Sequence, residues 1–268
     1  MDPVQVGILV GMGAFVGLAG GYAGIGGAPF LVAALALFLG FDQHTAQGTV
    51  LAVMLGPMSL AGVLVMRDRV RLLIPEIVLG VTTYALFSNL GARAAFAMDT
   101  EALEIGFGGL LILLGGRYLT QSRRATTASL IPDKVTLGRG WLVFSRWNVG
   151  VISALIGVVG GLFGIGAGVL MVPLFMGLFA LHKDDARALS LAILLPPVSV
   201  GAIVEYAHHD AIDWEVAGIM FILYFLTNHF GAKWGRAHET RTFLQVMGGI
   251  LLFLGATLVW TATSGSAA

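Results

Sequence analysis

The chain has 268 residues, of which 57% are hydrophobic and only 11% are charged. This composition lies far from that of a soluble globular domain and predicts a protein embedded in a lipid bilayer. The 15 basic and 15 acidic residues cancel, so the charge balance gives no sign of a nucleic-acid partner. The absence of cysteine excludes disulfides, thiolate metal sites and a cysteine nucleophile.

Apolar runs that predict membrane helices follow one another along the chain. In the first half they cover residues 4–20, 28–41, 45–66, 72–91 and 102–119. In the second half they cover residues 144–161, 168–181, 189–207, 214–231 and 242–261. We therefore divide the chain into a first membrane repeat over 1–119, a basic cytoplasmic linker over 120–143, a second membrane repeat over 144–262 and a disordered tail over 263–268.

The second half repeats the first at a constant offset of 140 residues. A Gly-rich stretch, GGYAGIGGAP at residues 20–29, returns as GGLFGIGAGV at residues 160–169. Further matches pair Pro57 with Pro197 and Gly91 with Gly231. The Gly-rich stretch is therefore part of the repeated unit.

The apolar runs on either side of each Gly-rich stretch are together too long for one crossing of a bilayer core about 30 Å thick. Either both runs cross the bilayer, or they form a re-entrant hairpin. Both choices return the chain to the side where it started, so each repeat crosses an odd number of times. The predicted fold is an all-α polytopic membrane protein of two inverted repeats, each with a Gly-broken helical hairpin plus three transmembrane helices.

The basic residues support this inversion, because Lys and Arg are enriched in cytoplasmic loops. Residues 67–71, RDRVR, have a counterpart at 207–211, AHHDA, with no Lys or Arg. The next loop, 93–104, carries one Arg with three acidic residues, whereas its counterpart is basic. This pattern predicts a multi-pass protein of the cell inner (plasma) membrane with both termini outside.

Glycines this dense interrupt a helix, and broken backbone at membrane depth is tolerated only where it is buried in protein or lines a cavity. In transporters built from inverted repeats, the N-terminal ends of interrupted helices can hold an anion near the midplane. The candidate substrate-binding residues at the two breaks are Gly24, Gly26, Gly27, Ala28, Gly164, Gly166, Ala167 and Gly168. Close helix packing is the alternative explanation for such glycines.

Polar side chains within the spans complete the predicted substrate-binding set: Thr49, Ser59, Asn89, Ser190, Ser199 and Asn228. The hydroxyls can donate to a substrate oxygen or bond to a backbone carbonyl. The amides can face the substrate or bond between helices. Glu205, with His208 and His209, can form either a proton-linked gate or a solvated loop end.

Two segments, GGYAGIGGAPFLV and GGLFGIGAGVLMVP, are each followed by a polar helix start, AQGTVL (46–51) and ARALSL (186–191). With these segments the chain resembles the sulfite exporter TauE/SafE family of membrane transporters over nearly its whole length, the linker excepted. The resemblance implies transport of a small sulfur-containing anion, namely sulfite, thiosulfate or an organosulfonate such as sulfoacetate. The expected partners are this small anionic substrate, the lipid bilayer and a coupling ion, a proton or sodium.

The predicted mechanism is alternating access around a midplane site at the two Gly-rich breaks. An anion channel-like pore is an alternative within transport. A membrane-embedded enzyme or its helper subunit is an alternative from another class, and it would show clustered titratable groups or metal ligands inside the spans. The spans show almost none, so we expect no enzyme activity, no cofactor and no metal.

Overall fold

A computed structural model describes residues 3–23, 27–57, 59–124, 142–166, 168–235 and 240–265. Every regular element in these ranges is an α-helix, as the apolar runs predict. The first half contains α1 (Pro3–Ala23), α2 (Ala28–Leu39), α3 (Gln43–Val53), α4 (Leu60–Val65), α5 (Arg67–Leu72), α6 (Ile74–Phe96) and α7 (Thr100–Arg124). The second half contains α8 (Arg146–Phe163), α9 (Gly168–Leu178), α10 (Lys183–Ile193), α11 (Val200–His208), α12 (Trp214–Gly235) and α13 (Thr240–Gly265).

Helix starts recur at the offset found in the sequence. In the first half α2, α3, α4, α6 and α7 begin at residues 28, 43, 60, 74 and 100, and α9 to α13 begin at 168, 183, 200, 214 and 240. Two helices of the first half do not follow this offset. Helices α1 and α8 begin at residues 3 and 146, and α5 has no equivalent, since residues 207–212 form the end of α11 and the turn after it.

The long helices pack in pairs that join the two halves: α1 with α12, α6 with α8, and α7 with α13. In the α7–α13 pair the glycines allow close backbone approach. A β-carbon added at Gly115 would lie 2.8 Å from the carbonyl oxygen of Gly248, and one added at Gly255 would lie 2.6 Å from that of Gly108. Because low numbers in α7 meet high numbers in α13, the two helices are antiparallel. Gly108 and Gly115 are the sequence counterparts of Gly248 and Gly255, so the same contact occurs twice with the halves exchanged.

The α1–α12 and α8–α6 pairs show the same relation, in which equivalent residues of the two halves make the same contact. A β-carbon added at Gly17 in α1 would lie 3.0 Å from the carbonyl oxygen of Tyr224 in α12. One added at Gly157 in α8 would lie 2.8 Å from the carbonyl oxygen of Tyr84 in α6. Each pair is 140 residues from the other, so the close-packing explanation for glycines holds at these positions.

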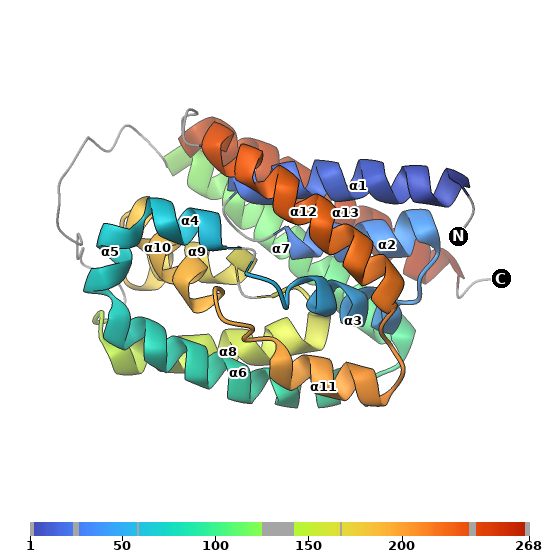
Figure 1. Ribbon diagram of the computed structural model, residues 1–268, viewed down its shortest axis with the longest axis horizontal. Coiled ribbons are helices and arrows are strands. Elements are labelled where there is room, and N and C mark those ends of the chain that lie inside the picture. The colour runs from blue at the N-terminus through green and yellow to red at the C-terminus, as the bar shows by residue number, and fades with distance from the viewer. Residues whose placement is uncertain are drawn as a thin grey trace.

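The short helices α2, α3, α9 and α10 contribute much of the interior. Every residue from Ala46 to Val53 in α3, and from Asp185 to Ile193 in α10, is buried. In Figure 1, α2, α3 and α11 lie toward the right-hand end with both chain termini, and α4, α5, α9 and α10 lie toward the left-hand end. The buried pair α2 and α3 of the first half and the buried pair α9 and α10 of the second half therefore lie toward opposite ends of the molecule.

Two apolar runs are divided where the sequence analysis expects continuous spans. Helix α3 ends at Val53 and α4 begins at Leu60, and α10 ends at Ile193 and α11 begins at Val200. The break of the first run contains Gly56 and Pro57, and that of the second contains Pro196 and Pro197. A proline has no N–H for the helix and its ring collides with the preceding turn, which explains both interruptions.

The predicted segment boundaries differ at two places. Helix α7 continues to Arg124, so it includes the start of the expected linker, of which residues 125–141 lie outside the described ranges. Helix α13 continues to Gly265 and includes Thr263, Ser264 and Gly265 of the expected tail.

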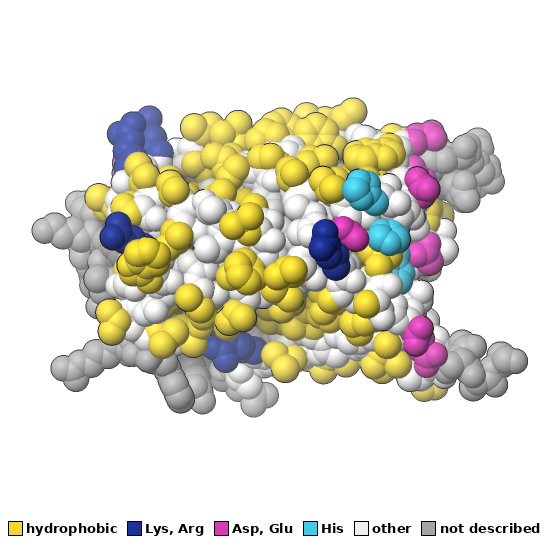
Figure 2. Space-filling view, turned by 90° about the horizontal axis from the view of Figure 1, so that it is seen from below, with side chains coloured by type: hydrophobic (Ala, Val, Ile, Leu, Met, Phe, Trp, Pro, Cys, Tyr) yellow, Lys and Arg dark blue, Asp and Glu magenta, His cyan; other side chains and the backbone are white. Residues whose placement is uncertain are grey.

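The surface combines apolar sides with charged ends. Large apolar side chains such as Leu86, Phe253 and Trp260 are exposed on the long helices, and hydrophobic atoms cover much of the face in Figure 2. Acidic side chains gather at the right-hand end of that view, and most basic ones lie farther left. Among the described helices, the segments Thr100–Thr120 and Arg146–Phe163 are long and apolar enough to cross a bilayer. Exposed apolar area of this extent marks an interaction surface, and a lipid bilayer fits it.

Candidate functional site

Both predicted helix breaks are present. Helix α1 ends at Ala23 and α2 begins at Ala28, and α8 ends at Phe163 and α9 begins at Gly168. Gly27 caps α2 with a φ of 61°, and Gly164 and Gly166 have φ values of 63° and 62°. Glycine is the residue that adopts this left-handed conformation without steric strain. Of the predicted break residues, Gly24, Gly26 and Ala167 lie outside the described residues.

The start of α2 offers fewer amides to an anion than a typical helix N-terminus. Pro29 has no N–H, and the N–H groups of Phe30 and Leu31 donate to the carbonyl oxygen of Gly27 at 3.1 and 3.2 Å. Only the amides of Gly27 and Ala28 are left as candidates there. An anion site at this break therefore needs donors from other helices.

The second break packs directly on α3. A β-carbon added at Gly164 would lie 2.5 Å from the β-carbon of Gln47 and 2.7 Å from its α-carbon. A β-carbon added at Gly166 would have no atom within 4 Å. Gly164 is thus a contact between the halves, whereas Gly166 faces open space.

Gln43 and Gln47, one helical turn apart on α3, form what we call the amide face. Both side chains are fully buried. The hydroxyl of Tyr206 in α11 donates to Oε1 of Gln47 at 2.7 Å and also lies 3.2 Å from the carbonyl oxygen of Gly161. Nε2 of Gln47 and both amide atoms of Gln43 have no hydrogen-bond partner among the described residues. A buried polar atom without a partner costs about 1–3 kcal/mol, so these atoms are candidates for a ligand or water.

The predicted hydroxyl residues separate into two groups. Oγ1 of Thr49 accepts from the backbone N–H of Asp213 at 3.0 Å, so Thr49 joins α3 to the start of α12. The Oγ atoms of Ser59 and Ser190 are buried and have no partner within the described ranges. Ser199 is buried at the start of α11.

The predicted amides lie on the long helices rather than on α3. Nδ2 of Asn89 in α6 donates to the carbonyl oxygen of Gly201 in α11 at 2.8 Å, which is the interhelical alternative of the sequence analysis. Asn228 is half-buried on α12.

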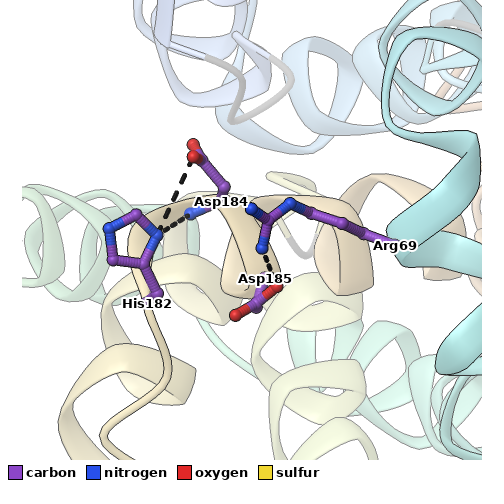
Figure 3. A network of polar contacts seen from close by, with 4 residues as sticks. All are labelled: Arg69, His182, Asp184 and Asp185. Carbon is purple, nitrogen blue, oxygen red and sulfur yellow. Dashed lines mark hydrogen bonds and ion pairs between the residues drawn. The ribbon is translucent and has the colours of Figure 1, made fainter. Parts of the chain in front are cut away.

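An ion pair lies at the opposite end of the interior, in the first turn of α10. Arg69 of α5 contacts the fully buried carboxylate of Asp185 (Figure 3). Beside it, Nδ1 of His182 lies 3.8 Å from a carboxylate oxygen of Asp184. Two residues after Asp185, Arg187 is also buried, with 9% of its surface exposed. Arg187 stands 140 residues after Gln47, so the counterpart of the amide is a cation.

A group of aromatic rings connects to the amide face through Tyr206. The ring of Phe96 stacks with His209 at 3.9 Å and with His44 at 4.9 Å, and its edge meets Tyr206 at 4.9 Å. Arg93 pairs with Glu205 nearby at 3.5 Å. His209 is exposed in the turn after α11, and its ring belongs to a stack that reaches the Tyr206–Gln47 hydrogen bond.

Sequence reasoning missed Gln43, Gln47, Tyr206 and the Arg69–Asp185 pair. The available signal was a pair of polar residues four positions apart near the start of α3, at 43 and 47, and a second such pair near the start of α10, at 183 and 187. The partners come from helices far away in the chain, which no local pattern indicates. Among the described residues, no group of three His, Asp or Glu side chains comes together to hold a metal.

A comparison with known protein families matches residues 9–258 to the family described as Sulfite exporter TauE/SafE. The chain belongs to the sulfite exporter TauE/SafE family. The match spans both halves and both Gly-rich breaks. The family resemblance seen in the sequence motifs is confirmed.

The chain is also similar to curated proteins described as probable membrane transporters. The TauE/SafE chain is 25% identical over 179 residues to the probable membrane transporter protein YunE of Bacillus subtilis (strain 168). That match covers 65% of each protein, so it spans just under two thirds of the B. subtilis protein. A probable membrane transporter protein of Xylella fastidiosa (strain 9a5c) is 27% identical over 212 residues, 78% of this chain and 77% of the relative. The corresponding protein of strain Temecula1 is 28% identical over 213 residues, with the same coverage. No solved structure matches the chain.

Proposed function

We propose that the chain is a membrane transporter for a small sulfur-containing anion, such as sulfite, thiosulfate or sulfoacetate. Two halves of inverted topology would alternate access to a site at the Gly-rich breaks. Membership of the sulfite exporter TauE/SafE family and the names of the curated relatives support transport as the function.

The observation that carries this proposal is the antiparallel, reciprocal packing of α7 and α13. These helices begin at equivalent positions of the two halves, and their Gly108–Gly255 and Gly115–Gly248 contacts are related by exchanging the halves. Equivalent helices that run in opposite directions are expected when one repeat is inverted relative to the other. Such repeats commonly rock against each other around a fixed site in secondary transporters.

The interior hairpins fit the same arrangement. In the first half α2 and α3 turn at the right-hand end of Figure 1, and in the second half α9 and α10 turn at the left-hand end. We infer that each Gly-rich hairpin re-enters the membrane from its own side rather than crossing it. In this arrangement each half crosses the membrane three times, and in the first half α3 and α4 together form one of these crossings.

The substrate assignment is supported by uncharged donors buried in the interior. Hydroxyls of Ser59 and Ser190, buried and unpartnered within the described ranges, can donate to the oxygens of a sulfur oxyanion. The orientation is supported by the charged ends of the molecule in Figure 2. By the bias of Lys and Arg toward the cytoplasm, the basic end would face the cytoplasm and the acidic end, with both termini, would lie outside the inner membrane.

Ligand binding and flux test the proposal. The purified protein is heated with sulfite, thiosulfate, sulfoacetate, taurine, sulfate, acetate or chloride, because a ligand that binds only the folded protein raises its apparent stability. We expect a selective rise in the unfolding temperature with one sulfur oxyanion, and saturable uptake of that anion into proteoliposomes. A response to acetate or chloride alone would overturn the substrate assignment. Counterflow, in which an anion trapped inside accelerates uptake from outside, separates a carrier from the pore alternative.

A further inference from the structure

The amide face has donors and an acceptor that nothing in the described protein satisfies. Nε2 of Gln47 and both Nε2 and Oε1 of Gln43 are buried without hydrogen-bond partners there. Buried side-chain amides in native proteins are normally bonded to protein or ordered water. Three unsatisfied atoms on neighbouring turns of one helix therefore indicate that a polar ligand or water belongs beside α3.

The two side chains lie on the same side of their helix. Gln43 and Gln47 are four residues apart, a spacing that places side chains next to each other on an α-helix. Gln47 is also the residue against which the second break packs at Gly164. The amide face is thus at the contact between the first half and the broken hairpin of the second.

Tyr206 determines which way the Gln47 amide points. Its hydroxyl carries a single proton and has two acceptors within reach, Oε1 of Gln47 at 2.7 Å and the carbonyl oxygen of Gly161 at 3.2 Å. We assign the proton to Oε1 of Gln47 because this contact is the shorter one. With Oε1 held by this bond, the two hydrogens of Nε2 are directed to other acceptors. Tyr206 is itself buried, and the edge contact with Phe96 holds its ring. The arrangement presents Gln47 as a hydrogen-bond donor.

The geometry points to Gln43 and Gln47 as residues that bind an oxygen of the transported anion, with Tyr206 as the residue that positions the Gln47 donor. This inference rests on the proposed function and adds a site that the glycine motifs do not indicate. The ligand class is a small sulfur oxyanion, whose oxygens accept from Nε2 of Gln47 and Nε2 of Gln43. Oε1 of Gln43 can accept from a protonated oxygen of the anion or from a water molecule bound with it.

An uncharged donor suits a site that must release its ligand. Amide N–H groups bind an anion through hydrogen bonds that gain from the ligand's charge, without placing a full positive charge beside it. On α3 the neighbouring buried residues carry no charge at all, whereas the equivalent position on α10 is Arg187. We therefore assign the oxyanion contact at the α3 end to hydrogen bonding alone.

The decisive variant is Gln47→Glu, which keeps the size of the side chain and an acceptor for the Tyr206 hydroxyl. It replaces the N–H donors with a carboxylate oxygen, which repels an anion. We expect the Kd for the sulfur oxyanion selected by the wild-type protein to rise at least about tenfold, because hydrogen bonds to charged groups are among the stronger ones. Gln47→Met, which is uncharged and of similar length, also removes the N–H donors and should likewise raise the Kd. Gln47→Met decides the question if Gln47→Glu does not fold.

Tyr206→Phe tests the positioning role. Loss of the hydroxyl frees the Gln47 amide to rotate, so we expect the KM for uptake to rise about threefold to tenfold while the maximal rate changes little. The matched control is Tyr118→Phe on α7. This change removes a buried hydroxyl that, unlike that of Tyr206, has no hydrogen-bond partner among the described residues. Its KM should equal that of the wild type.

Different results overturn different claims. If the wild-type protein responds to no sulfur oxyanion, the proposed function and this inference are both wrong. If the wild type binds one, but Gln47→Glu and Gln47→Met bind it with unchanged Kd, the inference alone is wrong and the amide face holds water only. A fall in the maximal rate of Tyr206→Phe with an unchanged KM would reject the positioning role.

Discussion

Helices α3 and α10 occupy equivalent places in the two halves and differ in their polar side chains. Both have eleven residues, both are buried through most of their length, and they begin 140 residues apart. Helix α3 carries the neutral amides of Gln43 and Gln47, whereas α10 carries the Asp185 carboxylate and Arg187. The α5 helix, absent from the second half, supplies the Arg69 partner of Asp185.

This comparison shows which features recur in the two halves and which differ between them. The starts of α2, α3, α4, α6 and α7 and the glycine contacts between long helices recur in the second half, because they determine how backbones pack. The buried polar groups differ, because each can change without moving the backbone if its own partners change with it. The interior therefore has one end with uncharged donors and one end with an ion pair.

The largest expected effect is at the contact of the second break with α3. Gly164→Ala combines left-handed backbone strain with overlap against Gln47, and we expect it to lower the free energy of unfolding by about 4 kcal/mol. Transport should be lost. Gly166→Ala is the matched control, since it has the same φ and open space, and it should lower stability by only about 1 kcal/mol. Equal losses in apparent unfolding temperature for the two variants would show that α3 does not hold the break.

A smaller effect is expected at the ion pair that distinguishes α10. Arg69→Ala leaves the buried Asp185 carboxylate without this partner and should lower stability by about 3 kcal/mol. Adding Asp185→Asn removes the buried charge and should restore part of the loss. Thermal unfolding of the purified single and double variants measures both. A double variant less stable than Arg69→Ala would contradict a simple charge-pair role.

The equivalence of the two halves can be tested at α7 and α13. Gly115→Ala and Gly255→Ala place a β-carbon against backbone of the other helix, and each should lower stability by about 2 kcal/mol. Gly109→Ala and Gly249→Ala are the matched controls, since nothing lies within 4 Å of the added carbon. Alanine is favoured over glycine in a helix by about 1 kcal/mol, so the controls should be neutral or stabilising. A large difference between Gly115→Ala and Gly255→Ala would mean that the halves do not share this contact equally.

The smallest expected effect concerns Thr49, whose counterpart on α10 is Leu189. Thr49→Val removes the acceptor for the N–H of Asp213 and should lower stability by about 1 kcal/mol. The KM for uptake should stay that of the wild type, because the hydroxyl oxygen joins α3 to α12. A raised KM with unchanged stability would instead support Thr49 as a substrate-binding residue.

The predicted site residues show which features of the site the sequence indicates and which depend on contacts between distant helices. The glycines of the breaks could be found because a duplicated, interrupted apolar run is visible in the sequence. For the hydroxyl of Thr49 and the amide of Asn89, the sequence left substrate binding and bonding within the protein as alternatives, and the structure adds a bond from the N–H of Asp213 to Thr49 and a bond from Asn89 to the carbonyl oxygen of Gly201. Gln47 was missed because the four-residue spacing from Gln43 does not by itself show that both amides are buried or that Tyr206 bonds to one of them.

The sequence by itself determined the helical class, the duplication and the two Gly-rich breaks, because hydropathy and a constant offset are properties of the chain read in order. Only the tertiary structure decided that Gly164 packs on Gln47, that Tyr206 orients the Gln47 amide and that Arg69 reaches Asp185. Each of these contacts joins residues of different halves. Their partners therefore depend on how the long helices of one half pack against those of the other, which no single stretch of sequence contains.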